Sequence, residues 1–240
     1  MKRDDWTILI VYIAMQFSSF AGIPLTAFIL KQLGQNQRLA VPYWLIISFS
    51  IGLAITLFIL RKEMRGTRDN RSGSSLSVSI IWAIFGVFLA LFAQSLAANI
   101  ERLIGVPMGS ENTQQILKII DTLPLTILVS SIFGPILEEI VFRKILFGTL
   151  YKRFNFFVSA LASSVIFALA HMEPQHVLLY SSMGFTFAYL YIRTKHILVP
   201  IFAHVAMNTL VVIIQSAFRN DLEKLIQDAG FVQNFIGGFL

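Results

Sequence analysis

The sequence predicts an all-α, polytopic transmembrane helix bundle with about seven spanning helices. Of its 240 residues, 56% are hydrophobic and only 13% are charged, and the mean hydropathy is +0.72. An ordinary soluble domain carries about 25% charged residues, so half of the polar surface that such a fold needs is missing. Helices are expected because a backbone in contact with lipid must satisfy its own hydrogen bonds. The whole chain, 1–240, is therefore predicted to be a single integral membrane domain.

Seven apolar segments are the candidate spans. Most approach the roughly 20 residues that cross about 30 Å of hydrocarbon, and the fifth and sixth are the shortest. The first continues without a clear cleavage site, so it is expected to be a retained span and not a signal peptide. In chain order the segments are Ile8–Leu30, Tyr43–Leu60, Ser77–Ala97, Leu123–Leu150, Phe157–His171, Val177–Ile192 and Ile197–Phe218.

Basic residues predict the orientation, because Lys and Arg are enriched in cytoplasmic connectors. Of the 19 present, 13 lie in the N-terminus and the stretches 61–71, 143–153 and 193–195, and the other six lie in the alternate connectors and the tail. This predicts a multi-pass protein of the cell membrane with its N-terminus in the cytoplasm and its C-terminus outside. The remaining polar connector, 99–121, is expected along the outer surface, and 222–240 as an interfacial helix or tail.

Charge and cysteine content exclude several classes of function. The net charge is +6, but no basic stretch has the interleaved aromatic residues of a nucleic-acid surface. The expected partners are therefore membrane lipids, with no nucleic acid. The chain has no cysteine, which excludes disulfides, thiolate metal sites and a cysteine nucleophile.

Two adjacent carboxylates lie in the middle of the fourth apolar segment, where an ionisable side chain costs at least about 2.5–3.5 kcal/mol and is a functional candidate by default. Glu139 and Arg143 are four residues apart, so they share a helix face and can neutralise each other. Glu138 points about 100° away and has Phe142 at its own i+4 position. Glu138 is thus the carboxylate that remains free to titrate, although a purely structural role in helix packing is an open alternative.

Two histidines lie in other apolar segments. His171 ends the fifth segment, and His204 lies within the seventh, where Asn208 shares its helix face. A single histidine in an apolar helix is more often packed and hydrogen-bonded than catalytic. Two of them, on different helices from Glu138, favour a shared site.

Together, Glu138-Glu139-x-x-x-Arg143, Phe167-x-x-x-His171 and His204-x-x-x-Asn208 resemble the signature of the CPBP intramembrane proteases, which include the CAAX prenyl endopeptidases and the Abi, or bacteriocin-processing, proteins. The resemblance covers 123–217, the expected catalytic core. It implies an intramembrane endopeptidase that hydrolyses a peptide bond of a membrane-associated peptide or protein.

The resemblance also implies roles. Glu138 would be the general base that takes a proton from water, and His171 would hold and polarise that water. His204 and Asn208 would donate hydrogen bonds to the oxyanion. Glu139, Arg143 and Phe167 would support the geometry of the site. The catalytic set is thus Glu138, His171, His204 and Asn208.

Metal dependence and function each leave an alternative. No cofactor is the preferred expectation, because HExxH is absent and Asn is a poor zinc ligand; if zinc is used, its ligands are His171, His204 and Glu138. The segments from 123 onward contain no aspartate pair or Gly-x-Ser-x-Gly motif for other intramembrane proteases. The alternative functions are a non-catalytic membrane scaffold, regulator or immunity protein of the same fold and, with less support, a proton-coupled transporter.

Overall fold

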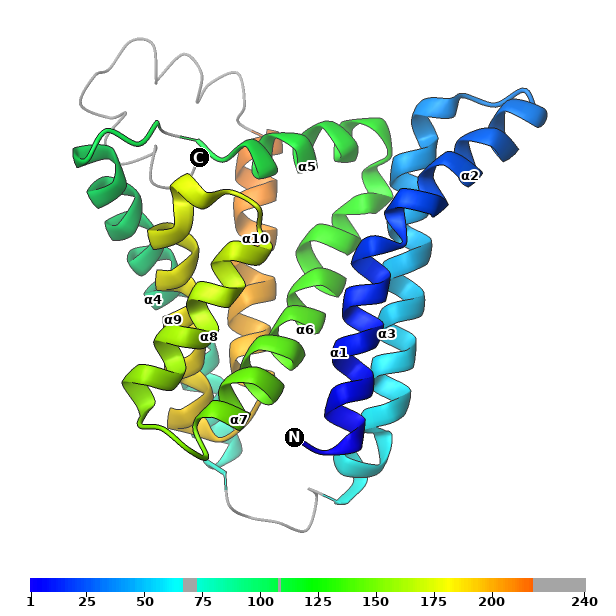
Figure 1. Ribbon diagram of the computed structural model, residues 1–240. Helices are drawn as coiled ribbons and strands as arrows, with labels where there is room; N and C mark the ends of the chain where they lie inside the picture. The colour runs from blue at the N-terminus through cyan, green and yellow to red at the C-terminus, as the bar shows by residue number, and fades with distance from the viewer. Residues whose placement is uncertain (67–72, 108, 218–240) are drawn as a thin grey trace.

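The computed structural model describes residues 1–66, 73–107 and 109–217, where the regular elements are helices joined by short turns (Figure 1). No strand occurs within those ranges, which confirms the all-α prediction. The 222–240 segment and the C-terminus lie outside the described residues.

The first apolar segment forms two helices, α1 (Arg3–Phe17) and α2 (Ser19–Gln32), which meet at an angle of 47°. The side chain of Ser18 lies at the bend, where its Oγ donates to the Met15 carbonyl and accepts from the Trp44 indole at 3.1 Å. Trp44 belongs to α3 (Ala40–Gly66), which follows the short η1 (Gln37–Leu39). A Cβ on Gly22 would lie 1.8 Å from the Trp44 ring, so α2 and α3 can approach this closely only because position 22 is glycine.

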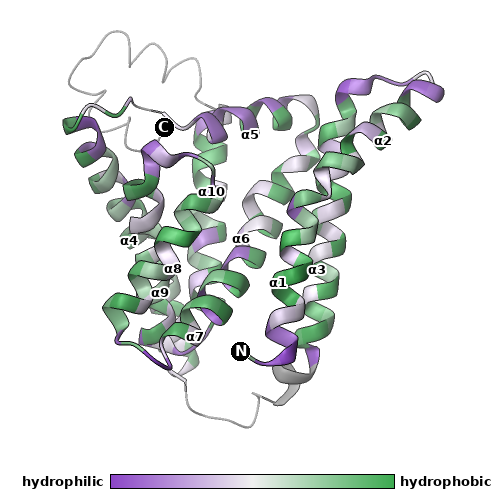
Figure 2. Cartoon of the chain, in the orientation of Figure 1, coloured by the Kyte–Doolittle hydropathy of each residue, from purple (hydrophilic) through white to green (hydrophobic). Residues whose placement is uncertain are grey.

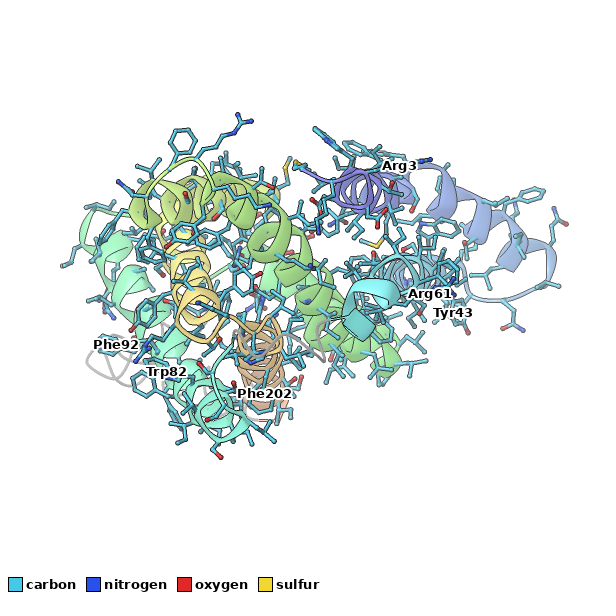
Figure 3. The ribbon with its side chains drawn as sticks, turned by 90° about the horizontal axis from the view of Figure 1, so that it is seen from below. Arg3, Tyr43, Arg61, Trp82, Phe92 and Phe202 are labelled. Carbon is cyan, nitrogen blue, oxygen red and sulfur yellow. The ribbon has the colours of Figure 1, made fainter. Side chains whose placement is uncertain are left out.

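A second group of helices packs around α4 (Leu76–Leu103). These helices are α8 (Phe156–Ala170), α9 (Val177–Thr194), which follows η5 (Pro174–His176), and α10 (Leu198–Ala217). Small residues set their spacing, since a Cβ on Gly184 of α9 would lie 2.9 Å from the Ser164 side chain of α8. Viewed along the helices, Figure 3 separates this group, with Trp82, Phe92 and Phe202, from α1–α3, with Arg3, Tyr43 and Arg61.

The fourth apolar segment lies between the two groups and changes its helical pitch. It comprises η2 (Pro124–Thr126), η3 (Val129–Phe133), α6 (Gly134–Glu138), η4 (Glu139–Phe147) and α7 (Gly148–Leu150). The elements η3 and η4 are π-helical, a form in which each amide bonds five residues back and which recurs at functional sites. Over the span Pro124–Leu150, 56% of the most apolar window is buried, against 22% for α3 and α4. This is the central element of the bundle.

The predicted number of seven spans is not confirmed. Four helical stretches within the described residues are long and apolar enough to cross a membrane, or five if the bent pair α1–α2 counts as one span. At 15 residues, α8 is about 22 Å long, which is short of the hydrocarbon thickness. The sixth predicted span corresponds to α9, which is also outside this set, packs against α4 and α8 and carries polar residues that contact them.

Apolar side chains cover the outside of the bundle, as a protein in lipid requires. Figure 2 shows hydrophobic colouring along the helices and hydrophilic colouring toward both ends, including the short helix α5 (Glu111–Thr122), which crosses one end. The N-terminus, the start of α4 and the turns α7–α8 and α9–α10 lie at the opposite end (Figure 1). Most of the basic residues that the structure describes belong to that second end.

Candidate active site

A cavity of about 510 Å³ lies between the two groups of helices. The helices α1, α3, α5, α6, α8 and α10 all contribute to its wall. Three of the four residues predicted to be catalytic line it, namely Glu138, His171 and Asn208. The fourth, His204, is buried directly behind Glu138, so the folded chain brings all four together from three separate segments.

Glu138 presents its carboxylate to this cavity. It is the last residue of α6, and its side chain is 19% exposed, whereas that of Glu139 is fully buried. The two adjacent carboxylates therefore face different surroundings, as the helical spacing predicts. His204 lies beside Glu138, and its Nε2 atom is 3.8 Å from Oε2 of that carboxylate. That distance is too long for a direct hydrogen bond, so the carboxylate remains available to a molecule in the cavity.

Glu139 and Arg143 form the ion pair that the spacing predicts, with 3.2 Å between Oε2 and Nε, and both side chains are fully buried. The two terminal nitrogens of Arg143 have no hydrogen-bond partner among the described residues. Instead, the guanidinium carbon lies 4.5 Å from the ring centre of Phe167, 5.6 Å from that of Phe187 and 5.9 Å from that of Phe142. Aromatic faces attract a cation most strongly where water is excluded, so these rings compensate part of the lost hydration.

His204 connects the two carboxylates. Its Nδ1 lies 3.0 Å from Oε1 of Glu139, and its ring stacks on Phe187 with 4.6 Å between centres. Because a carboxylate accepts, Nδ1 carries the hydrogen in this contact. The Nε2 atom is then directed toward Glu138. Glu139 thus fixes the orientation of the imidazole.

His171 approaches the cavity from the end of α8. Its Nδ1 lies 2.8 Å from the Phe167 carbonyl oxygen, which accepts, so in the neutral ring Nε2 is the acceptor. The ring stacks on Tyr180 of α9 with 4.1 Å between centres. Phe167 therefore contributes twice, with its carbonyl to His171 and with its ring to Arg143.

Asn208 reaches the same cavity from α10, one turn beyond His204. Its Nδ2 donates to the Ser130 carbonyl at 3.3 Å. That carbonyl lies in the π-helical stretch η3, where the regular helix ladder is altered. The second N–H of the amide remains for a ligand.

Sequence reasoning missed a second set of polar contacts at one end of the cavity. Glu173 accepts hydrogen bonds from the hydroxyls of Ser110 and Tyr180 and from the backbone N–H of Asn112. Burial alone would raise the pKa of Glu173, but these hydrogen bonds outweigh it and hold the pKa below its ordinary value. Through Tyr180, this carboxylate is linked to the ring that stacks on His171.

A buried pair of distant residues also went unpredicted. His176, which directly precedes α9, is only 5% exposed. Its Nδ1 lies 2.8 Å from Oε2 of Glu101, 75 residues away in the sequence. The second oxygen of Glu101 accepts from the Leu179 amide at 2.9 Å. No local spacing could have predicted contacts of such long range.

The alternative zinc site stays a prediction. In the part of the chain that the structure describes, no three His, Asp or Glu side chains converge in a way that could hold a metal ion. Nδ1 is engaged in both imidazoles, by Glu139 in His204 and by the Phe167 carbonyl in His171, so Nε2 is the remaining nitrogen of each ring. No step is assigned to a metal below.

An apolar helix bundle that encloses a carboxylate, two imidazoles and an amide around one cavity is an integral membrane protein with the layout of a membrane-embedded hydrolase. Comparisons with known proteins agree with this class. The family model described as "Type II CAAX prenyl endopeptidase Rce1-like" matches residues 120–210. No solved structure matches the chain significantly.

Two curated bacterial proteins are similar over nearly the full length. The protein named "Putative membrane peptidase YdiL" of Bacillus subtilis (strain 168) is 50% identical, with 99% of each chain covered. The protein named "Membrane-embedded CAAX protease MroQ" of Staphylococcus aureus (strain USA300) is 31% identical, with 93% of this chain and 94% of that protein covered. The chain belongs to the Rce1-like CAAX protease family of membrane peptidases.

Proposed function

We propose that this protein is an intramembrane endopeptidase that hydrolyses a peptide bond of a membrane-associated peptide or protein. The observation that carries the proposal is the contrast between the two adjacent glutamates. Glu139 is fully buried and bound by Arg143 and His204, whereas Glu138 opens onto the cavity and has only the His204 Nε2 atom near its carboxylate, at 3.8 Å. A carboxylate at a cavity wall without a direct hydrogen bond can take a proton from water.

Glu138 acts as the general base in this scheme. A water molecule between Glu138 and His171 gives its proton to the Glu138 carboxylate while its oxygen bonds to the carbonyl carbon of the substrate. His171 accepts a hydrogen bond from the other O–H of that water through Nε2, because Nδ1 is engaged by the Phe167 carbonyl, and this hydrogen stays on the oxygen. Glu138 then returns the proton to the amide nitrogen as the carbon–nitrogen bond breaks.

His204 and Asn208 stabilise the oxyanion of the tetrahedral intermediate. Asn208 donates the N–H that the Ser130 carbonyl does not use. His204 donates through Nε2, which requires both ring nitrogens to carry hydrogen, because Nδ1 already donates to Glu139. The role of the Glu139–Arg143 pair is to keep this imidazole oriented between two carboxylates. In comparable sites one such donor is worth about 2.7–4 kcal/mol.

The setting of the reaction is the cell membrane. The partners in this proposal are the surrounding lipids and a membrane-associated peptide, and the N-terminus lies in the cytoplasm, as the distribution of basic residues predicts. The lipid setting favours substrates that enter laterally or from the interface, since the outer surface of the bundle is apolar.

The test compares membrane peptides from cells that produce the wild-type protein with those from cells that produce Glu138→Gln. Peptides whose abundance depends on Glu138 identify the cleaved bond and supply a reference peptide for kinetics. Purified wild-type protein in proteoliposomes should cleave that peptide, and Glu138→Gln should not. Identical peptide profiles, together with retained cellular function in Glu138→Gln, would instead identify a non-catalytic scaffold, regulator or immunity protein of this fold.

A further inference from the structure

The helix α1 brings two polar side chains into the wall of the cavity. Tyr12 and Gln16 line the same cavity as Glu138, His171 and Asn208. They are four residues apart and so share one face of α1. The family model matches 120–210 and does not include this helix. The residues of α1 are therefore a contribution to the site that the shared motifs do not describe.

Polar side chains are few in this helix. Gln16 is the only amide side chain in α1, which apart from Tyr12 is otherwise apolar after Thr7. Tyr12 is only 8% exposed, whereas Gln16 is exposed, and both residues line the cavity. A hydroxyl in an apolar environment without a compensating hydrogen bond costs several kcal/mol on hydrocarbon scales. A ligand in the cavity that accepts from the Tyr12 hydroxyl would remove this cost.

Within the described residues, the one hydrogen bond between them leaves donors and acceptors of these two cavity-lining residues unused. The Nε2 of Gln16 donates to the Tyr12 hydroxyl oxygen at 3.2 Å. Among the described residues, no protein group accepts the hydroxyl hydrogen of Tyr12, and Gln16 keeps its Oε1 and a second N–H. The Tyr12 ring packs edge-on against Phe142 with 6.0 Å between centres, and Phe142 follows Glu138 by one helical turn. This contact holds Tyr12 against the segment that carries Glu138.

We propose that Tyr12 and Gln16 bind the main chain of the substrate peptide and align it in the cavity across from Glu138. The Tyr12 hydroxyl donates to a peptide carbonyl, and Oε1 of Gln16 accepts from a peptide N–H. This pairing matches the one donor and one acceptor that each peptide unit presents. Both are positioning residues, since they hold the substrate and take no part in proton transfer. This inference rests on the proposed endopeptidase function.

The test measures kcat and KM for the reference peptide with purified full-length protein in proteoliposomes. The variants are Gln16→Met, which keeps the length of the side chain without its polar atoms, and Tyr12→Phe, which removes one oxygen. Each should raise KM about 2- to 13-fold, the loss of one neutral hydrogen bond, while kcat stays within about twofold. The matched control is Thr7→Val on the same helix; Thr7 bonds only to the Arg3 carbonyl and does not line the cavity.

Ester analogues of the reference peptide identify the N–H that Gln16 accepts. In a scan that replaces one backbone N–H at a time by oxygen, one position should raise KM for the wild-type protein but not for Gln16→Met. Wild-type KM in both variants, or kcat and folded fraction falling together at constant KM, would overturn the inference. Activity in Glu138→Gln would instead defeat the proposed function, so the two failures are distinguishable.

Discussion

Replacing Glu139 by Gln should destabilise the protein far more than replacing Glu138 by Gln, although the two residues are adjacent. The Glu139 carboxylate is fully buried between Arg143 and His204, so Glu139→Gln leaves the Arg143 charge unpaired in the core. Breaking a buried pair by removing one partner costs about 3–5 kcal/mol. For a chain of this size, each kcal/mol lowers Tm by about 2–4 °C. The expected fall in Tm is therefore about 6–20 °C.

Glu138→Gln keeps the volume of a side chain that faces the cavity, so Tm should stay within about 2 °C of the wild-type value. Hydrolysis should fall by about 10²–10⁴, the usual contribution of a general base. The assay is a thermal melt of purified protein at one heating rate, with turnover of the reference peptide. As a matched control, Arg143→Met added to Glu139→Gln should recover most of the lost Tm, because no charge is then left unpaired. Equal falls in Tm for the two single variants, or an active Glu138→Gln enzyme, would refute this assignment of roles.

Four further outcomes can be measured. Asn208→Ala should lower kcat about 10²–10³-fold with KM nearly unchanged, because an oxyanion contact strengthens only in the transition state; a rise in KM alone would contradict this role. Metal analysis of active, purified protein should find no stoichiometric zinc, and one tightly bound zinc per chain would overturn the glutamate mechanism. The lowered pKa of Glu173 means that its stabilisation is complete above the ordinary pKa of 4.5 and is lost as the pH falls through the lower folded value. Tm should thus drop on acidification below about pH 4.5, and the drop should shrink in Glu173→Gln. Because the chain has no cysteine, a membrane-impermeant thiol reagent should label Ile104→Cys but not Lys2→Cys in intact cells, and the reverse pattern would invert the orientation.

The short-range part of the site could be predicted from the sequence. The spacing of Glu139 and Arg143 fixed which carboxylate is paired, and the structure has this ion pair at 3.2 Å. The roles of Glu138, His171, His204 and Asn208 in catalysis remain predictions, because geometry alone does not measure turnover. The helical class followed from composition, since only helices suit so apolar a chain.

Other features depend on tertiary contacts and had no local signal. Apolar length suggested seven spans, a number that is not confirmed, and it could not show that α9 is packed against α4 and α8. The same limit hid the π-helical turns around Glu139 and the bond between Glu101 and His176 across 75 residues. Tyr12 and Gln16 were overlooked because a tyrosine and a glutamine four residues apart are unremarkable until a cavity faces them.

The enclosure of Arg143 has a consequence for how the protein is made. Of the groups that compensate this buried charge, Glu139 and Phe142 lie in the same segment, whereas Phe167 and Phe187 belong to helices synthesised later. His204, which completes the contacts of Glu139, follows 65 residues later, a delay of roughly 3–13 s at the rate of translation. During that interval the nascent central segment has its charges only half satisfied and is a poor candidate for release into lipid. Contacts with α8, α9 and α10 complete the enclosure of this charge, so the central segment is expected to be stable in the bilayer only after these later helices have packed against it.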